Sequence, residues 1–146
     1  MNISIDVSRL VNTAVDNIKA QLHSRAFSAA QELRTAELEV LRGQRSGRRY
    51  KRPASGHKLR NGKIGYRYYT ASAPGEPPAV RSTSGGLRGS FRAVIIDGIT
   101  PAIETNKIYA PYLEEGTSKM APRPYKERVI EKAMPGIEAI YAEPFN

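Results

Sequence analysis

The most regular pattern in the chain is a stripe of apolar residues near its start. Apolar residues recur there mostly at every third or fourth position, which places them on one face of an α-helix. They are Val7, Leu10, Val11, Ala14, Val15, Ile18, Leu22, Ala26, Ala29, Ala30, Leu33, Leu38 and Leu41. Asp6 or Ser4 is suited to cap the start of this helix, and Gly43 to end it. The pattern predicts a long helix over residues 6–42, which we expect to pack partly on a sheet and partly on a neighbouring subunit.

Three later segments have the composition of β-strands. Residues 64–70 are aromatic and β-branched. Residues 91–97 and 99–107 surround Asp97-Gly98, a dipeptide that suits a tight hairpin turn. Residues 73–79 hold three prolines, which withhold backbone donors and favour a stiff, extended connector. These segments predict a small antiparallel sheet.

The sequence pattern of the last part of the chain predicts two helices. Residues 108–115 suggest a short helix that ends at Gly116. An amphipathic helix follows from about residue 125, with Pro135 kinking or dividing it. The predicted fold class is therefore α+β: a small antiparallel sheet packed with a long N-terminal helix and a shorter C-terminal helix, plus a basic extended loop.

A chain of 146 residues is long enough for one compact core, so we expect a single domain over 1–146. Its predicted parts are the helix 6–42, a basic mobile loop 43–65, strands with a proline-rich connector 66–107, and the helical end 108–146.

Basic residues are concentrated in one of these parts. The chain carries 23 Lys and Arg against 14 Asp and Glu, and no acidic residue lies between Glu39 and Glu76. Such a segment attracts either a nucleic acid or an acidic protein surface, through a salt-sensitive attraction without sequence specificity. The candidate binding residues are Arg42, Arg45, Arg48, Arg49, Lys51, Arg52, Lys58, Arg60, Lys63 and Arg67.

Residues suited to catalysis are scarce. Cysteine is absent, which excludes disulfides, thiolate zinc sites and cysteine nucleophiles and suits a reducing compartment. His23 and His57 have no partner at metal-ligand spacing, and the adjacent Glu114 and Glu115 do not face each other as a catalytic pair would. We expect a protein that is not an enzyme and that uses no cofactor or metal. Neither a basic-then-apolar leader nor an apolar run of about 20 residues is present, so we expect neither export by such a leader nor a membrane partner.

Three segments carry a resemblance to a known family. They are residues 71–80 (ASAPGEPPAV), 84–90 (SGGLRGS) and 109–125 (YAPYLEEGTSKMAPRPY). In this order and spacing they resemble the tail-completion or neck proteins of tailed bacteriophages, also described as head-tail joining proteins or minor tail components. The helices before and after also fit, so the resemblance covers nearly the whole chain.

The chain departs from the family pattern at four positions. The last segment of the family usually reads Glu-Phe-Gly-Thr-Ser, then a small residue, Arg-Pro and Phe. Here Glu115 replaces the first Phe, Pro122 takes a small-residue position and Tyr125 replaces the final Phe, while Ser84 stands where Thr is commoner. The residues that the resemblance marks as motif and interface candidates are Pro74, Gly75, Pro77, Pro78, Gly85, Leu87, Arg88, Ser90, Tyr112, Glu114, Gly116, Thr117, Arg123 and Pro124.

The resemblance implies a structural protein of the virion, made in the bacterial host cytoplasm and placed at the neck or the top of the tail. It implies partners of three kinds: copies of the chain in a ring, expected to be a hexamer; neighbouring connector, tail-terminator or tail-tube proteins; and genomic DNA in the lumen. The basic segment keeps an alternative open, a free basic nucleic-acid-binding protein that acts through residues 42–67.

Overall fold

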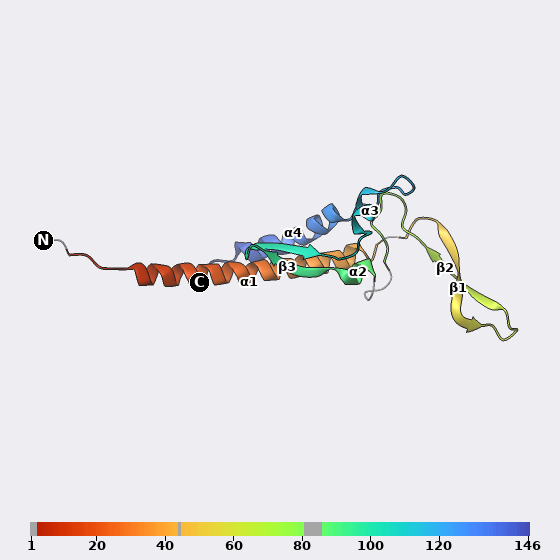
Figure 1. The fold of residues 1–146 in the computed structure, drawn as a ribbon, viewed down its shortest axis with the longest axis horizontal. Helices are drawn as coiled ribbons and strands as arrows, with labels where there is room; N and C mark the ends of the chain where they lie inside the picture. The colour runs from red at the N-terminus through yellow and green to blue at the C-terminus, as the bar shows by residue number, and fades with distance from the viewer. Residues whose placement is uncertain (1–2, 44, 81–85) are drawn as a thin grey trace.

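The computed structural model describes residues 3–43, 45–80 and 86–146. The molecule is elongated, with α1 along its long axis (Figure 1). The helices are labelled α1 to α4 and the strands β1 to β4, each in chain order. Their bounds are α1 Ser8–Val40, β1 Arg49–Lys58, β2 Ile64–Thr70, α2 Leu87–Ser90, β3 Arg92–Ile96, β4 Thr100–Glu104, α3 Ala110–Glu115 and α4 Lys126–Ala142.

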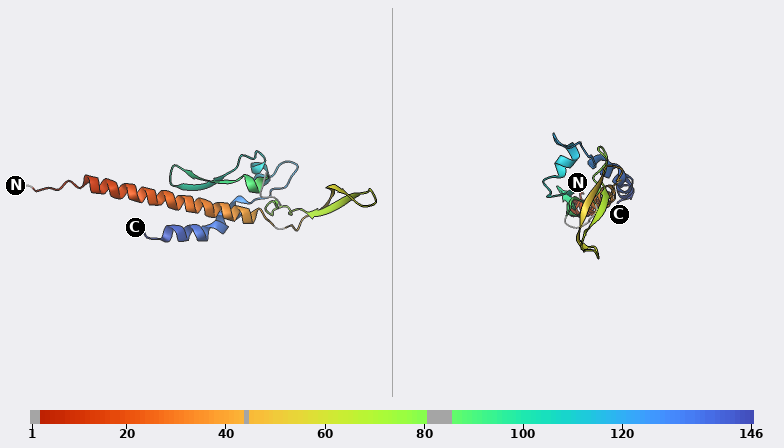
Figure 2. Two further views of the ribbon diagram at one scale, coloured as in Figure 1. Left: turned by 90° about the horizontal axis from the view of Figure 1, so that it is seen from below. Right: turned by 90° about the vertical axis from the view of Figure 1, so that its right-hand side faces the viewer.

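The predicted α+β fold class is confirmed, with a long N-terminal helix and a shorter C-terminal helix. The strands form two separate antiparallel pairs, β1 with β2 and β3 with β4, in place of one small sheet. The β3–β4 pair and α4 pack against the C-terminal half of α1. The β1–β2 hairpin projects beyond the C-terminal end of α1, and the first turns of α1, before the hydrogen bonds that Asn17 and Gln21 make with Asn146, extend uncovered at the opposite end (Figure 2). Within the described part of the chain, no helix is long and apolar enough to cross a membrane.

The prediction of a mobile loop over residues 43–65 is wrong. Residues 49–58 form β1, which pairs with β2 in the register Arg49↔Thr70 to Pro53↔Tyr66. The register shifts between Pro53 and Lys58, where a proline offers no backbone donor for regular pairing. The contacts that stabilise β1 join its side chains to tyrosines of β2. Because these contacts are made to another strand, the sequence of β1 itself shows no periodic pattern that would predict a strand.

Asp6 and Gly43 both lie near the ends of α1, although the residue at the N-cap position is Val7 rather than the predicted Asp6 or Ser4. Asp6 accepts a hydrogen bond from the backbone N–H of Ser8 at 2.9 Å, and bonds from Ser8 lower the pKa of its carboxyl. At the other end Gly43 has a φ of 61°, and a Cβ there would meet Cα of Ala79 at 3.0 Å. The observed helix is two residues shorter at each end than predicted. Glycine at position 43 is thus required both by the backbone conformation and by the close approach of the chain.

The core is small and lies along the second half of α1. One buried cluster contains Leu41, Leu87, Ala110 and Tyr125, and a second contains Ala36, Val129 and Ala133. Most buried residues of α1 are alanines, which allow α4 to approach closely. Residues 3–20 are all exposed, so the first half of the apolar stripe contributes nothing to this core.

The β3–β4 turn has the predicted conformation, whereas α4 differs from its prediction at Pro135. Asp97 and Gly98 both adopt positive φ, 53° and 75°, as the predicted tight turn requires. Pro135 lies inside α4, which continues through it as one helix. The proline therefore does not divide the C-terminal helix.

The corner after α3 depends on Gly116. Its φ is 78°, and its N–H donates to the Tyr112 carbonyl at 2.9 Å. A Cβ at this position would meet Pro122 N at 2.8 Å and Met120 O at 2.9 Å, both backbone atoms that cannot yield easily. The chain folds back on itself here, and Arg123 N donates to the Leu113 carbonyl at 2.8 Å.

Replacing Gly116 with Ala is expected to lower the free energy of unfolding by more than about 2 kcal/mol. The backbone of Gly116, with φ 78° and ψ 178°, lies in a region nearly confined to glycine, which costs another residue about 1–3 kcal/mol, and the contacts with Pro122 and Met120 add to it. Gly98→Ala is the matched control, because Gly98 also has positive φ (75°) but nothing lies within 4 Å of its Cβ position. Urea denaturation of both variants measures the difference. Equal losses for the two variants would contradict the steric role of Gly116.

Candidate functional site

The β1–β2 hairpin is a two-stranded ribbon with cations and tyrosines on both faces. Because side chains alternate along a strand, the register places Arg49 and Lys51 on one face with Tyr66 and Tyr68. The opposite face carries Arg52 and Arg67, together with Tyr50 and Tyr69. These side chains are exposed. The hairpin is therefore a basic and aromatic surface on both sides.

Aromatic contacts hold the cations of this ribbon in place. The guanidinium of Arg49 lies 4.5 Å from the ring centroid of Tyr68, and Lys51 Nζ lies 3.9 Å from that of Tyr66. On the other face, Tyr50 stacks on Tyr69 with ring centroids 5.5 Å apart. Such contacts contribute about 0.5–1 kcal/mol each at exposed sites. They also explain why a strand rich in Arg and Lys forms at all.

Arg52 and Arg67 are direct cross-strand partners. Like charges in this position repel each other and destabilise a hairpin. Both line a groove of about 820 Å³ at the base of the hairpin, and Arg45, Tyr69 and Arg123 line it too. No ion pair between described residues involves the basic residues of this groove. The groove therefore concentrates positive charge without an intramolecular counterion.

The structure places the ten predicted basic residues in four parts of the fold. Arg42 follows the end of α1, and Arg60 and Lys63 lie at the turn between β1 and β2. Lys58 ends β1, but its side chain lies outside the part that the structure describes. The remaining six lie along the hairpin or at its base, and they are Arg45, Arg48, Arg49, Lys51, Arg52 and Arg67.

The proline-rich connector is fixed to the corner after α3. Gly75 N donates to the Pro122 carbonyl at 3.0 Å, while Pro77 and Pro78 are buried and Pro74 is exposed. Glu76 accepts hydrogen bonds from Ser46 Oγ and from the backbone N–H of Ala73, and these bonds lower the pKa of its carboxyl. The connector is thus attached both to the corner and to the base of the hairpin.

Arg123 links the corner to the hairpin base directly. Its Nη1 donates to the Ser72 carbonyl at 2.7 Å and also to the Ser72 hydroxyl. Ser72 is only 3% exposed, and sequence reasoning did not identify it. Its partner is 51 residues away, so no local pattern could have shown this contact.

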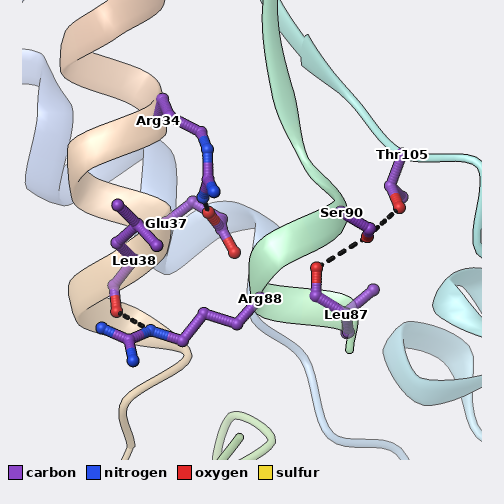
Figure 3. Close-up of polar contacts among 7 residues, drawn as sticks. All are labelled: Arg34, Glu37, Leu38, Leu87, Arg88, Ser90 and Thr105. Carbon is purple, nitrogen blue, oxygen red and sulfur yellow. Dashed lines mark hydrogen bonds and ion pairs between the residues drawn. The ribbon is translucent and has the colours of Figure 1, made fainter. Parts of the chain in front are cut away.

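The second motif segment fastens to the end of α1 (Figure 3). Arg88 Nε donates to the Leu38 carbonyl at 2.7 Å, which satisfies an acceptor in the last turn of the helix. Ser90 Oγ donates to the Leu87 carbonyl at 2.7 Å and lies 2.5 Å from Thr105 Oγ1. Leu87 is buried in the core, and Gly85 lies outside the described residues. These contacts give Leu87, Arg88 and Ser90 a role within the subunit.

A buried ion pair lies beside this contact. Glu37 is 0% exposed and pairs with Arg34, but its Oε1 has no hydrogen-bond partner among the described atoms. Burial, together with the charge of Arg88, lowers the pKa of Arg34. Glu37 also lines a second groove, of about 630 Å³, between α1, β4, α3 and α4. Sequence reasoning missed this pair, because Glu37 and Arg34 read as ordinary helix-surface residues.

Glu114 reaches from α3 to the start of α4. Its Oε2 accepts hydrogen bonds from Tyr125 N at 2.8 Å and from Lys126 N at 3.2 Å. It therefore caps α4, whose first N–H groups have no acceptor inside the helix. Tyr125 donates to the Ala110 carbonyl at 3.2 Å, and burial, with the charge of Glu114, raises its pKa to about 12.

Three other motif candidates remain at the surface. Tyr112 and Pro124 are exposed, and Thr117 is exposed beside the short turn that it forms with Met120. Of the two histidines, His23 Nδ1 lies 3.2 Å from the Gly98 carbonyl, and the side chain of His57 lies outside the described part. The described residues contain no group of three His, Asp or Glu side chains placed to hold a metal ion.

Comparisons with protein-family models, with curated proteins and with solved structures find no match to this chain. The resemblance to neck proteins therefore stays a prediction. The geometry divides its motif residues into those that join the elements of one subunit and those that stay exposed. The basic hairpin is the candidate binding site.

Replacing Glu114 with Ala is expected to lower the free energy of unfolding by about 1 kcal/mol, the usual effect of losing a helix N-cap. Glu115→Ala is the matched control. Glu115 is the adjacent exposed glutamate, and no hydrogen bond among the described residues joins its side chain to α4. We expect that variant to stay within about 0.5 kcal/mol of the parent. Thermal or urea unfolding at neutral pH compares the two, and equal effects would remove the capping role.

Proposed function

We propose that the chain is a non-enzymatic structural protein of a tailed phage or prophage, a neck or tail-completion component that forms a ring and helps to join the tail to the head. The observation that carries this proposal is the large surface that a single copy leaves uncovered. The order of the three motif segments supports the phage setting.

The exposed area of the chain exceeds that of a compact globular monomer of the same mass. The single copy exposes 10926 Å². A folded monomer of this mass, 16.1 kDa, exposes about 7,400 Å² by the scaling that compact proteins follow. The excess of about 3,500 Å² exceeds what one standard interface buries per partner, which is about 800 Å². The chain therefore has surface for two neighbours, as a ring requires.

The first half of α1 supplies one apolar face for such a contact. Leu10, Val11 and Ile18 are 71%, 53% and 45% exposed and lie on the same side of the helix. This side continues into the stripe that packs on the protein's own core further along α1. The charged residues between 3 and 20 are two acids and two bases, so the face has no net charge to attract a polyanion. A second copy of the chain is the occupant that fits it.

A second apolar surface lies at the other side of the core, around α3. Ile108, Tyr109 and Tyr112 are all exposed there, and Tyr112 belongs to the motif that the resemblance marks. Two different apolar surfaces on one subunit can form head-to-tail contacts, which close into a ring when the rotation permits. The proposed ring, expected to be a hexamer, would use these two surfaces.

The second candidate function is a free nucleic-acid-binding protein, and the basic hairpin is the observation that favours it. This function needs no assembly of subunits. The two functions are therefore distinguished by the mass of the purified protein and by its place in a particle, rather than by nucleic-acid binding alone.

The purified protein is expected to assemble at high concentration, with a mass that is a multiple of 16.1 kDa. Val11→Glu and Ile18→Glu should each reduce this mass to that of a single chain, because a charge buried in the contact is costly. Ala20→Glu is the control, since Ala20 is exposed and lies on the opposite side of the helix from Ile18. Light scattering measures the mass, and circular dichroism checks that α1 is intact. A wild-type protein that stays monomeric would contradict the ring.

Particles assembled without this protein should contain filled heads and separate tails. The protein supplied in trans should restore joining, whereas Val11→Glu should not, because it lacks the subunit contact. Electron microscopy counts joined particles in each case. Normal joining in its absence would end the neck proposal, and flanking genes for ribosomal or metabolic proteins would argue against it independently.

A further inference from the structure

The basic residues of the β1–β2 hairpin take no part in the proposed ring contacts. Ten basic residues lie between Arg42 and Arg67, while no acid lies between Glu39 and Glu76. We propose that the β1–β2 hairpin is a binding site for the phosphate backbone of double-stranded DNA, with Arg52 and Arg67 at its centre. The inference does not depend on the ring, because one hairpin is a complete ribbon within a single chain.

The cross-strand pair Arg52↔Arg67 is the first observation that points to an anion. Two guanidinium groups placed opposite each other weaken the hairpin in the absence of a counterion. Arg45 and Arg123 line the same groove. A phosphate has the charge and the acceptor geometry to bridge such groups, since a guanidinium can donate two parallel hydrogen bonds to it. Binding would thus remove the repulsion that the free hairpin contains.

The cation–π contacts are the second observation. Arg49 stacks on Tyr68, and Lys51 lies over Tyr66. A guanidinium that stacks on a ring keeps its N–H edge directed outward, where it can donate to a phosphate. The order that these contacts impose also reduces the entropy lost when a ligand binds. The cations are therefore positioned in advance.

The distribution of charge favours a nucleic acid over an acidic protein surface. Protein–protein interfaces are enriched in arginine and tyrosine but depleted in lysine, and their centre is apolar. Here the cross-strand pair Arg52↔Arg67 lies in the middle of the ribbon with Lys51 next to it. Phosphate binding requires no apolar centre, and most contacts that proteins make with DNA go to phosphate and sugar.

The shape of the site favours a duplex. The major groove of B-DNA admits a two-stranded β-ribbon and has a phosphate backbone along each wall. A ribbon with cations on both faces can reach both walls at once. This hairpin projects beyond the end of α1 (Figures 1 and 2), and at its base the face with Arg52 and Arg67 borders the groove that Arg123 also lines. We expect binding without sequence preference, because arginines directed at phosphates carry no sequence information.

The test measures fluorescence anisotropy of a labelled mixed-sequence duplex with the full chain. For the wild type, the dissociation constant should rise steeply between about 50 and about 200 mM salt. The double variant Arg52→Gln/Arg67→Gln should weaken binding about tenfold or more and reduce the log–log salt slope by about two. It removes the like-charge pair, so the hairpin itself should not lose stability.

The matched control is Arg9→Gln/Lys19→Gln, which lowers the net charge from +9 by the same two charges. Both residues are exposed on α1, away from the hairpin. This variant should keep the salt slope of the wild type. Equal weakening by the two double variants would overturn the site, and so would the absence of DNA binding at low salt.

Two competitors decide between classes of partner. Poly-glutamate that binds more tightly than the duplex, at equal concentration of charge, would overturn the proposal in favour of an acidic protein surface. A single strand that binds more tightly than the duplex of equal length would overturn the groove geometry. The Val11→Glu variant should keep the duplex affinity per hairpin, so a failure of assembly and a failure of DNA binding are observed separately.

Discussion

The fold of the chain depends on what attaches to the last turns of α1. Arg88 donates to the Leu38 carbonyl, and the carbonyl of Leu41 accepts from Val80 N at 2.8 Å. The side chain of Leu41 is fully buried against Leu87 in the same place. The last carbonyls of a helix have no hydrogen-bond donor inside the helix, so each of these bonds satisfies an acceptor that would otherwise have no protein partner. The connector, α2 and the strands after it are positioned by these few contacts.

The ion pair of Arg34 and Glu37, with Glu37 buried and Arg34 partly exposed, lies beside this attachment. A buried ion pair contributes little net free energy compared with an apolar replacement, because desolvation opposes the attraction. A Glu37 that lost Arg34 would be a buried charge with no partner, which is strongly unfavourable. The burial of Glu37 therefore requires that Arg34 stay beside it. The pair lies on α1 next to the carbonyl that Arg88 binds (Figure 3).

Sequence reasoning succeeded where structure depends on neighbouring residues and failed where it depends on distant ones. The 3.6-residue stripe predicted α1, Asp97-Gly98 predicted the β3–β4 turn, and Gly116 predicted the end of α3. The strand β1 was missed, because the tyrosines that stabilise it lie on another strand. Ser72 was missed for the same reason, since its partner Arg123 comes from a different part of the chain. For the binding site, the sequence identified the cations but not the ribbon that places them on two faces.

The two ends of the molecule differ in the physics of their contacts. Residues 3–20 carry an apolar face and two acids balanced by two bases, so association through that face would depend on buried area and would be insensitive to salt. The hairpin at the opposite end is basic, so its contacts weaken as salt rises. In a ring built through α1, every hairpin would lie at the same end of its subunit and hence in one circle. Weak, non-specific contacts from each hairpin would then act at a high effective concentration on one polyanion. Assembly would thus combine hairpins that each bind a polyanion weakly into one ring that binds it tightly.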